Sequence, residues 1–396
     1  MGWGEGRLLD AACLEHLRTA LCTLNIDAAM LTDHSTHLGE VTFRDMLWIA
    51  DGDEPELDTD GTPIANRMVC PDGHRALVMV GNEDQLMSVG LRRQPIMTSV
   101  VAELEAAYDA DGPEGVQMFR DAGALVFIPH TEQRSVDYLR TIGIDGMEIF
   151  NLHASIDPRI RGPHLGLDSD FLSTLLEFVN DDGELEPDLL FLSFFAESDN
   201  YLNKWDTLLA EGQHVTGVAG TDAHENSFPG LMSDGERGDS YRRMMRWFQN
   251  YLLVREVGYD GVREALDHGR GYVSFDVFGT PVNFDFFATS GAQTFDMGDD
   301  APPGSTLHVT APRLHESVPS NPYPQIRTRL LRSTPAGAVE VLASSDSDLE
   351  IVAEPGVYRA EARITPHHLR PYLGHLADAL IEEHVWIYSN PIYVRP

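Results

Sequence analysis

Four short apolar segments in the first two thirds of the chain are each followed by histidine or carboxylate residues. The first three segments lead to His34, Glu83 and His130, and the fourth leads to both Asp222 and His224. Imidazole nitrogens and carboxylate oxygens are ligands that suit Zn, Mn or Fe, and an Asp-x-His segment can present both kinds from one loop. These residue types therefore indicate a site for divalent metal ions (Zn, Mn or Fe).

Each of these motifs also has an ordinary structural interpretation. A single histidine after a strand is more often a capping or hydrogen-bonded residue, and a single aspartate there is often a helix N-cap. The set of four carries more weight, because the carboxyl ends of parallel strands meet at one face of a barrel, as a metal site requires. We therefore expect the five side chains to point into one pocket.

The four segments belong to an alternation of strand-like and helical patterns. Continuous apolar strands that alternate with helices are typical of a parallel sheet covered on both faces. The sequence predicts strands at residues 27–32, 76–81, 124–129, 146–151, 188–193 and 214–220. Apolar residues at helical spacing predict helices at 8–24, 98–109, 113–122, 135–142, 168–180, 205–211 and 260–271.

The pattern changes after about residue 275, where short strand-like pieces alternate with turn signals. Such spacing is typical of a β-sandwich. A chain of 396 residues also suits two domains. We therefore expect an α/β barrel over residues 1–275 and a β-sandwich-like C-terminal domain over residues 276–396.

The composition excludes several classes of partner. The net charge is −35, with 63 acidic against 28 basic residues, whereas nucleic-acid binding relies on Lys and Arg at phosphates. We therefore expect neither nucleic acid nor an anionic membrane as a partner. No apolar run approaches the ~20 residues of a membrane span, and the start lacks the pattern of a signal peptide. We expect Cys13, Cys22 and Cys70 to be buried free thiols.

Several motifs together resemble a known superfamily. LTDHST (31–36), GNE (81–83), IPH (128–130) and GTDAH (220–224) resemble motifs of the PHP (polymerase and histidinol phosphatase) superfamily. GRGYVSFDVFG (269–279) and HVWIYSNPIYV (384–394) resemble its carbaryl-hydrolase-like (CehA/McbA-type) branch. The resemblance implies a distorted (β/α)7 barrel with two or three metal ions, whose ligands include His34, Glu83, His130, Asp222 and His224.

Two features of that superfamily are not found. One is a His-x-His motif on the first strand, and the other is a histidine several residues after Glu83. The sequence also predicts six barrel strands instead of seven, and it begins with a helix. Either the start codon was placed too late, so that the true N-terminus lies upstream, or the first strand has been lost. We favour the misplaced start and expect a gap beside strand 27–32.

The expected activity is hydrolysis of a small-molecule ester by a metal-activated water. Glu83 would bridge two ions, and His34 and Asp222 would act with it as the catalytic ligands. The superfamily resemblance suggests a phosphoester, and the branch resemblance admits a carbamate or carboxylic ester. Asn151, His153 and Arg134 are weaker candidates for contact with the substrate.

A non-catalytic binding protein on a degenerate PHP barrel is the alternative. It would have lost the first strand and too many ligands, and its β-rich domain would contact a glycan or a protein. A His-x-His motif encoded in frame shortly before Met1 would favour the enzyme. The sequence leaves the oligomeric state and the compartment open.

Overall fold

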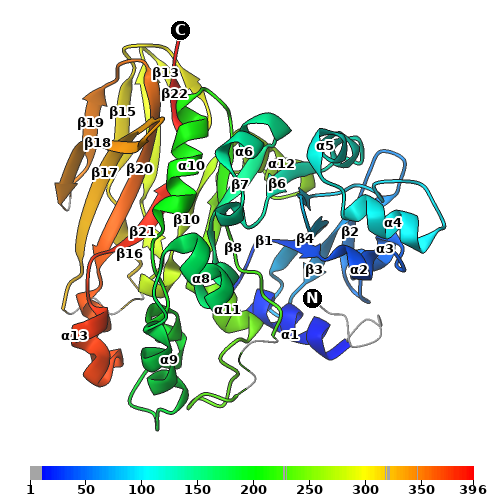
Figure 1. The fold of residues 1–396 in the computed structure, drawn as a ribbon, viewed down its shortest axis with the longest axis horizontal. Coiled ribbons are helices and arrows are strands. Elements are labelled where there is room, and N and C mark those ends of the chain that lie inside the picture. Colours follow the sequence, from blue (N-terminus) through cyan, green and yellow to red (C-terminus); the bar gives the residue numbers. More distant parts are fainter. Residues whose placement is uncertain (1–10, 226–227, 229, 317, 319–321, 346) are drawn as a thin grey trace. The chain divides into compact units, whose positions relative to one another are not determined.

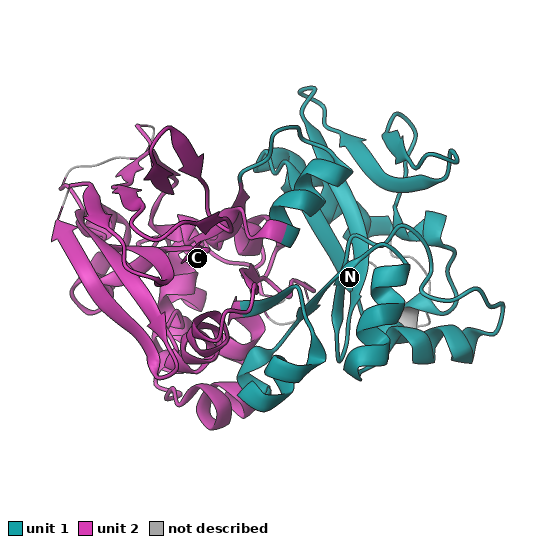
Figure 2. Cartoon of the chain, turned by 90° about the horizontal axis from the view of Figure 1, so that it is seen from above, with its two compact units in different colours: residues 1–148, 253–267 teal, residues 149–252, 268–396 magenta. Residues whose placement is uncertain are grey.

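The computed structural model describes residues 11–396 except for 226–227, 229, 317, 319–321 and 346. The chain forms two compact units, which Figure 2 draws in different colours. Unit 1 comprises Met1–Glu148 and Leu253–Asp267, and unit 2 comprises Ile149–Leu252 and His268–Pro396. These units are groups of residues in mutual contact, and the division into domains after residue 275 remains a prediction.

Unit 1 contains a mixed sheet with β4 (Arg75–Glu83) at its centre. One edge of β4 pairs in parallel with β1 (Ala28–Asp33), and the other edge pairs antiparallel with β3 (Pro63–Val69) and then β5 (Met87–Val89). The sheet continues from β3 to β2 (Glu54–Leu57), and from β5 to β6 (Leu125–Ile128) and β7 (Gly146–Asn151). β6 and β7 are buried along their whole length and so is nearly all of β4, as their apolar sequences predict.

Short capped helices connect these strands. Thr42 and Asp45 form a reciprocal capping box at α3 (Phe43–Met46), and Ser135 caps α6 (Val136–Ile142). The other helical segments of the first part of the chain are α1 (Ala11–Thr23), α2 (Ser35–Leu38), α4 (Val101–Tyr108), α5 (Gly112–Asp121) and the 3₁₀ turn η1 (Thr131–Gln133); α12 (Tyr259–His268) follows later.

A disulfide joins Cys22 of α1 to Cys70, which directly follows β3. The expectation of buried free thiols was therefore wrong for this pair, and Cys13, which forms no disulfide among the described residues, is partly exposed and not buried. The two cysteines lie 48 positions apart in the sequence, and nothing local in the sequence indicates that α1 packs beside the end of β3.

Unit 2 begins with the last three residues of β7, and β8 (Thr216–Gly220) is next in the strand order of that sheet. Asn250 and Asn390 each pair with the backbone of β8. Asn250 accepts from the N–H of Ala219 and donates to its carbonyl, both at 2.9 Å. Asn390 does the same at Gly217, at 2.8 and 3.2 Å.

The remaining helices of unit 2 lie between and beyond these strands. They are α7 (Leu152–Ile156), α8 (Pro158–Leu165), α9 (Phe171–Val179), the 3₁₀ helix η2 (Pro187–Ser193), α10 (Asp199–Ala210), α11 (Tyr241–Trp247), η3 (Asp276–Phe278), η4 (His367–Tyr372), η5 (Gly374–Leu376) and α13 (Ala377–Leu380).

The C-terminal part of unit 2 is rich in strands, as expected. The larger sheet has the order β14-β22-β20-β21-β10-β9, with β17 pairing β20 and β18. A second sheet has the order β13-β12-β15-β19, and β11 pairs β16. The bounds are β9 (Gln249–Leu252), β10 (Gly271–Ser274), β11 (Pro281–Val282), β12 (Asp285–Ser290), β13 (Gln293–Phe295), β14 (Asp300–Ala301), β15 (Thr306–Thr310), β16 (Arg313–Leu314), β17 (Gln325–Thr334), β18 (Gly337–Ser345), β19 (Leu349–Val352), β20 (Gly356–Thr365), β21 (His384–Ser389) and β22 (Ile392–Val394).

Helix α10 packs against β17, β18 and β20 (Figure 1). Asp206 of this helix accepts two hydrogen bonds of 3.0 Å from Arg359 of β20 and one of 2.6 Å from Ser333 of β17. All three residues are buried. The buried carboxylate of Asp206 therefore finds its hydrogen-bond donors only when α10 is packed correctly on the strand-rich region of unit 2.

In the described part of the chain no strand pairing closes the first sheet into a ring. The structure corrects two expectations about its strands. Residues 188–193 form η2 and not a strand. β2, β3 and β5 are antiparallel to their neighbours, so the sheet is mixed and not parallel. Among described residues β4 is the one strand that pairs with β1, and residues 8–10 of the first expected helix lie outside the described residues. No described helix is both long enough and apolar enough to cross a membrane.

Candidate metal centre

The register of β1 and β4 brings His34 and Glu83 side by side. Thr32 lies opposite Gly81 and Asp33 lies opposite Asn82 in this parallel pair, so the next residue of each strand emerges at the same end. The Nδ1 atom of His34 lies 2.6 Å from the backbone carbonyl oxygen of Glu83. Because a carbonyl oxygen only accepts, Nδ1 carries the proton and Nε2 keeps the lone pair that binds metal.

His130 completes the set in unit 1. It follows β6, and its Nε2 lies 3.5 Å from Oε1 of Glu83. Two donors bound about 2.0–2.1 Å from one tetrahedral zinc ion lie about 3.3 Å apart. The separation between His130 and Glu83 therefore suits two ligands of one ion, and imidazole with carboxylate is a suitable donor set for Zn, Mn or Fe.

Two buried glutamates hold His130 in this orientation. Oε1 of Glu132 lies 3.1 Å from Nδ1 of His130, and Oε2 of Glu148 accepts the backbone N–H of His130 at 2.8 Å. The backbone of His130 is left-handed, with φ of 49°, which costs free energy in a residue with a side chain. The contacts with both glutamates offset that cost and direct Nε2 toward Glu83.

The charges around His130 strongly favour its protonated form. Burial lowers its pKa, but the hydrogen bond to Glu132 and the negative charges of Glu148, Glu132 and Glu83 raise the pKa to about 10. The proton on Nε2 is the one that a bound cation would replace.

Sequence reasoning missed Glu132 and Glu148 as parts of this site. A signal was present, since Glu148 is the one charged residue in the otherwise apolar strand GMEIFN and is 1% exposed. A carboxylate so deeply buried requires a partner. Asp84 is a further neighbour, since its Oδ2 accepts the N–H of Ser35 at 2.8 Å. Burial raises the pKa of Asp84, against that hydrogen bond and the charge of His34.

Unit 2 brings together the other two expected ligands. Nδ1 of His224 lies 3.0 Å from Oδ1 of Asp222 and 2.9 Å from its backbone oxygen. Burial raises the pKa of Asp222, but hydrogen bonds from His153 and His224 bring it below its ordinary value. The hydrogen bond to Asp222 raises the pKa of His224. Asp222 also has a left-handed backbone, with φ of 46°.

The three candidates for substrate contact lie in different surroundings. Asn151 is buried, and its side chain caps α7 by accepting the N–H of Ala154 at 2.9 Å. Arg134 donates to the side chain and backbone of Gln85 at 3.0 and 3.2 Å. His153 contacts Asp222, with Nδ1 2.9 Å from Oδ2. His153 and Asp222 both belong to a group of donor atoms that lie close enough together to hold a metal ion.

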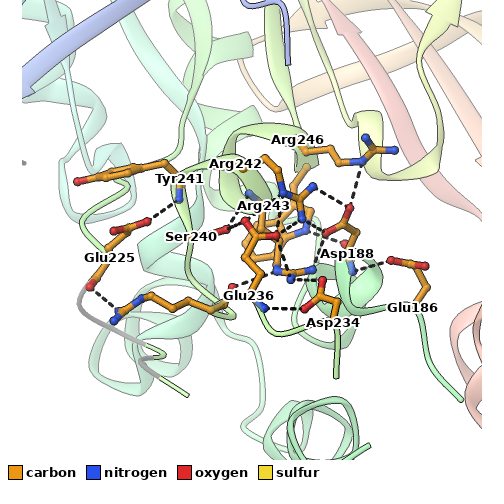
Figure 3. A network of polar contacts seen from close by, with 12 residues as sticks. Glu186, Asp188, Glu225, Asp234, Glu236, Ser240, Tyr241, Arg242, Arg243 and Arg246 are labelled. Atoms are coloured by element: carbon orange, nitrogen blue, oxygen red, sulfur yellow. Dashed lines mark hydrogen bonds and ion pairs between the residues drawn. The ribbon is translucent and has the colours of Figure 1, made fainter. Parts of the chain in front are cut away.

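The loop that carries Asp222 and His224 is anchored by polar contacts. Arg237 donates to the backbone oxygen of Glu225 at 2.5 Å, and the side chain of Glu225 accepts the N–H of Tyr241 at 3.2 Å. Figure 3 shows the contact between Glu225 and Tyr241 beside a larger network. Both contacts involve Glu225, so the residue directly after His224 is fixed to the first residue of α11 and to the segment before that helix.

That larger network contains a second acidic group, Asp188, Asp234 and Glu236, which also lies within the spacing of metal ligands. Arginine side chains form ion pairs with all three carboxylates of this group (Figure 3). Arg243 binds Asp188 at 2.5 Å and Asp234 at 2.8 Å, while Arg242 binds Asp188 at 2.7 Å and also Glu236. Because guanidinium groups already balance these carboxylates, we assign the group a structural role in fixing η2 and the loop before α11.

Each unit contributes a set of the expected ligands. Unit 1 brings together His34, Glu83 and His130, and unit 2 brings together Asp222 and His224, with His153 in contact. Each set combines imidazole with carboxylate, and in each a hydrogen bond fixes a histidine ring. We found no family model that matches this chain, and no match among curated proteins or solved structures.

Proposed function

We propose that this chain is a metal-dependent hydrolase of esters, related to the PHP superfamily. The observation that carries the proposal is the 3.5 Å separation between Nε2 of His130 and Oε1 of Glu83, which suits two ligands of one ion. The resemblance of the motifs that contain these residues points in the same direction. The proposed substrate is a small phosphoester, or a carbamate or carboxylic ester.

The residues of unit 1 would hold a metal ion through Nε2 of His34, the carboxylate of Glu83 and Nε2 of His130. Glu132 keeps the proton of His130 on Nδ1, which leaves Nε2 for the ion. Asp222 and His224 are the ligands proposed for unit 2. A bound divalent ion supplies an activated water and polarises the ester oxygen under attack.

The acidic surface bears on the choice of substrate. A net charge of −35 repels an anionic phosphoester, whereas bound cations reverse the sign of the charge at the site itself. A phosphoester is therefore compatible with the proposal, and a neutral carbamate or carboxylic ester is not repelled. The activity test includes all three classes.

The test is hydrolysis by the full chain loaded with Mn²⁺ or Zn²⁺, together with the amount of metal bound. We expect metal-dependent turnover of at least one ester class, and we expect Glu83→Gln and Asp222→Ala to lower both turnover and bound metal. His164→Ala is the matched control, because His164 is an exposed histidine of unit 2 outside both ligand sets. A protein that binds neither ion and hydrolyses no ester would refute the proposal and favour a non-catalytic binding protein.

A further inference from the structure

Helix α9 has apolar residues on two of its faces. One face packs on η2, and its three residues are buried, namely Phe171, Leu175 and Phe178. The second face repeats the same i, i+4, i+7 spacing one position further along with Leu172, Leu176 and Val179, which are 43%, 56% and 36% exposed. Because residues at this spacing are neighbours on one side of a helix, these three residues form a continuous apolar row at the surface, the α9 stripe.

A continuous row of exposed apolar side chains indicates a contact site. Single exposed apolar side chains are common on proteins, whereas a contiguous patch marks a surface that binds a partner. A helix that is apolar on more than one face is typically covered on all of them. The segment beside α9 contributes a further apolar side chain. His375 contacts Glu177 of α9, and Tyr372, three residues before His375, is 38% exposed.

The charged side chains around the α9 stripe have one sign. Residues 162–203 contain neither Lys nor Arg. Exposed carboxylates lie before α9, within it and after it, at Asp168, Asp170, Glu177, Asp182, Glu184 and Glu186. A partner that covers the stripe brings these carboxylates close to its own surface, where only positive charge compensates them. The partner therefore needs an apolar face that is bordered by Lys or Arg.

We propose that the α9 stripe is a docking site for a basic amphipathic helix of another protein. Such a helix places apolar residues at i, i+4 and i+7 against the stripe, and its flanking Lys and Arg side chains meet the carboxylates on either side. A second copy of this chain fits poorly, because pairing two α9 helices would bring the acidic segments 168–170 and 181–184 against each other. The inference goes beyond the proposed hydrolysis and does not depend on it.

The test measures binding of a fluorescein-labelled helical peptide of Leu and Lys, with all Leu on one face, to the full chain by fluorescence anisotropy. We expect Leu176→Gln to weaken binding at least about 10-fold, and Leu172→Gln, the second variant, to weaken it as well. Leu57→Gln is the matched control and should bind like the wild type, because Leu57 is a leucine of unit 1 with the same exposed fraction as Leu176, 56%. A peptide of the same composition in scrambled order, which has no apolar face, should bind at least about 10-fold more weakly.

Added salt should also weaken binding of the helical peptide, because it screens the exposed carboxylates. Three results would overturn the inference. In the first, both α9 variants bind the peptide like the wild type, so the attraction comes from net charge alone. In the second, sedimentation velocity shows that the chain by itself forms a dimer that Leu176→Gln dissociates, so a second copy covers the stripe. In the third, the wild-type protein does not bind the helical peptide.

Discussion

Asp276 makes the stability of unit 2 depend on pH in a direction opposite to that of an ordinary ion-paired carboxylate. Burial raises its pKa from 3.8 to about 6, although Ser274 and Tyr251 each donate a hydrogen bond of 2.6 Å to it. A carboxyl whose pKa is higher in the folded state stabilises the protein fully below the unfolded pKa. That stabilisation is lost as the pH rises through the folded pKa.

The size of the effect follows from the shift. Two pKa units correspond to about 3 kcal/mol, which is an upper estimate because Asp276 is partly exposed. Asn at this position stays neutral and keeps the contacts with both hydroxyl groups. We therefore expect Asp276→Asn to gain up to about 3 kcal/mol of unfolding free energy relative to the wild type as the pH rises from 4 to 7, with no further gain above pH 7.

Urea denaturation of both proteins at a series of pH values measures this difference directly. Asp182→Asn is the control, because it removes a negative charge from an exposed position of the same unit. The difference between variant and wild type isolates Asp276 from the many other carboxylates of the chain. A difference that stays constant from pH 4 to pH 7 would refute the reasoning, and so would one that falls.

Three further predictions concern other contacts. Cys70→Ser should lower the unfolding free energy in urea by about 4 kcal/mol, since the disulfide closes a loop with a sequence separation of 48; equal stability with and without a reductant would contradict this. Arg359→Met should cost about 3–5 kcal/mol in thermal unfolding by leaving Asp206 buried and unpaired, and adding Asp206→Asn should recover part of the loss. Glu132→Gln should weaken Mn²⁺ binding about 10- to 100-fold in calorimetry, because it loosens the ring of His130; unchanged affinity would remove Glu132 from the site.

The strands that end in candidate ligands could be predicted because their signal is local. A buried strand needs a continuous apolar run, and the polar residue that ends the run marks where the chain leaves the sheet. The runs before His34, Glu83 and His130 are strands at nearly the expected bounds. The parallel register of β1 and β4 then places the first two of these residues together.

Residues 188–193 show where this reasoning stops. A short apolar run does not distinguish a buried strand from a buried helical turn. Pro187 begins the segment, and Asp188 turns back to bind Arg243. Phe191 enters an aromatic cluster, stacked on Trp247 at a centroid distance of 5.2 Å. These partners lie far along the sequence, so no local pattern predicts the 3₁₀ helix.

The roles of single residues in the candidate site were harder to predict than its location. His153 was expected to contact substrate because it follows a strand, and its proximity to Asp222 is visible only in three dimensions. The disulfide could not be predicted for the same reason, because Cys22 meets Cys70 only when α1 packs onto the sheet. Pairings between distant segments depend on tertiary packing, which a single sequence does not reveal.

The two asparagines that bond to the backbone of β8 have a consequence for self-association. A strand at the end of a sheet offers its N–H and carbonyl groups to any other chain, which is a common route to aggregation. A side-chain amide has the same donor and acceptor as a peptide group, so Asn250 and Asn390 act as a substitute strand at Ala219 and Gly217. These two backbone sites are therefore closed to a second molecule, and since β8 is buried from Thr216 to Ala219, the sheet ends there without an exposed strand edge.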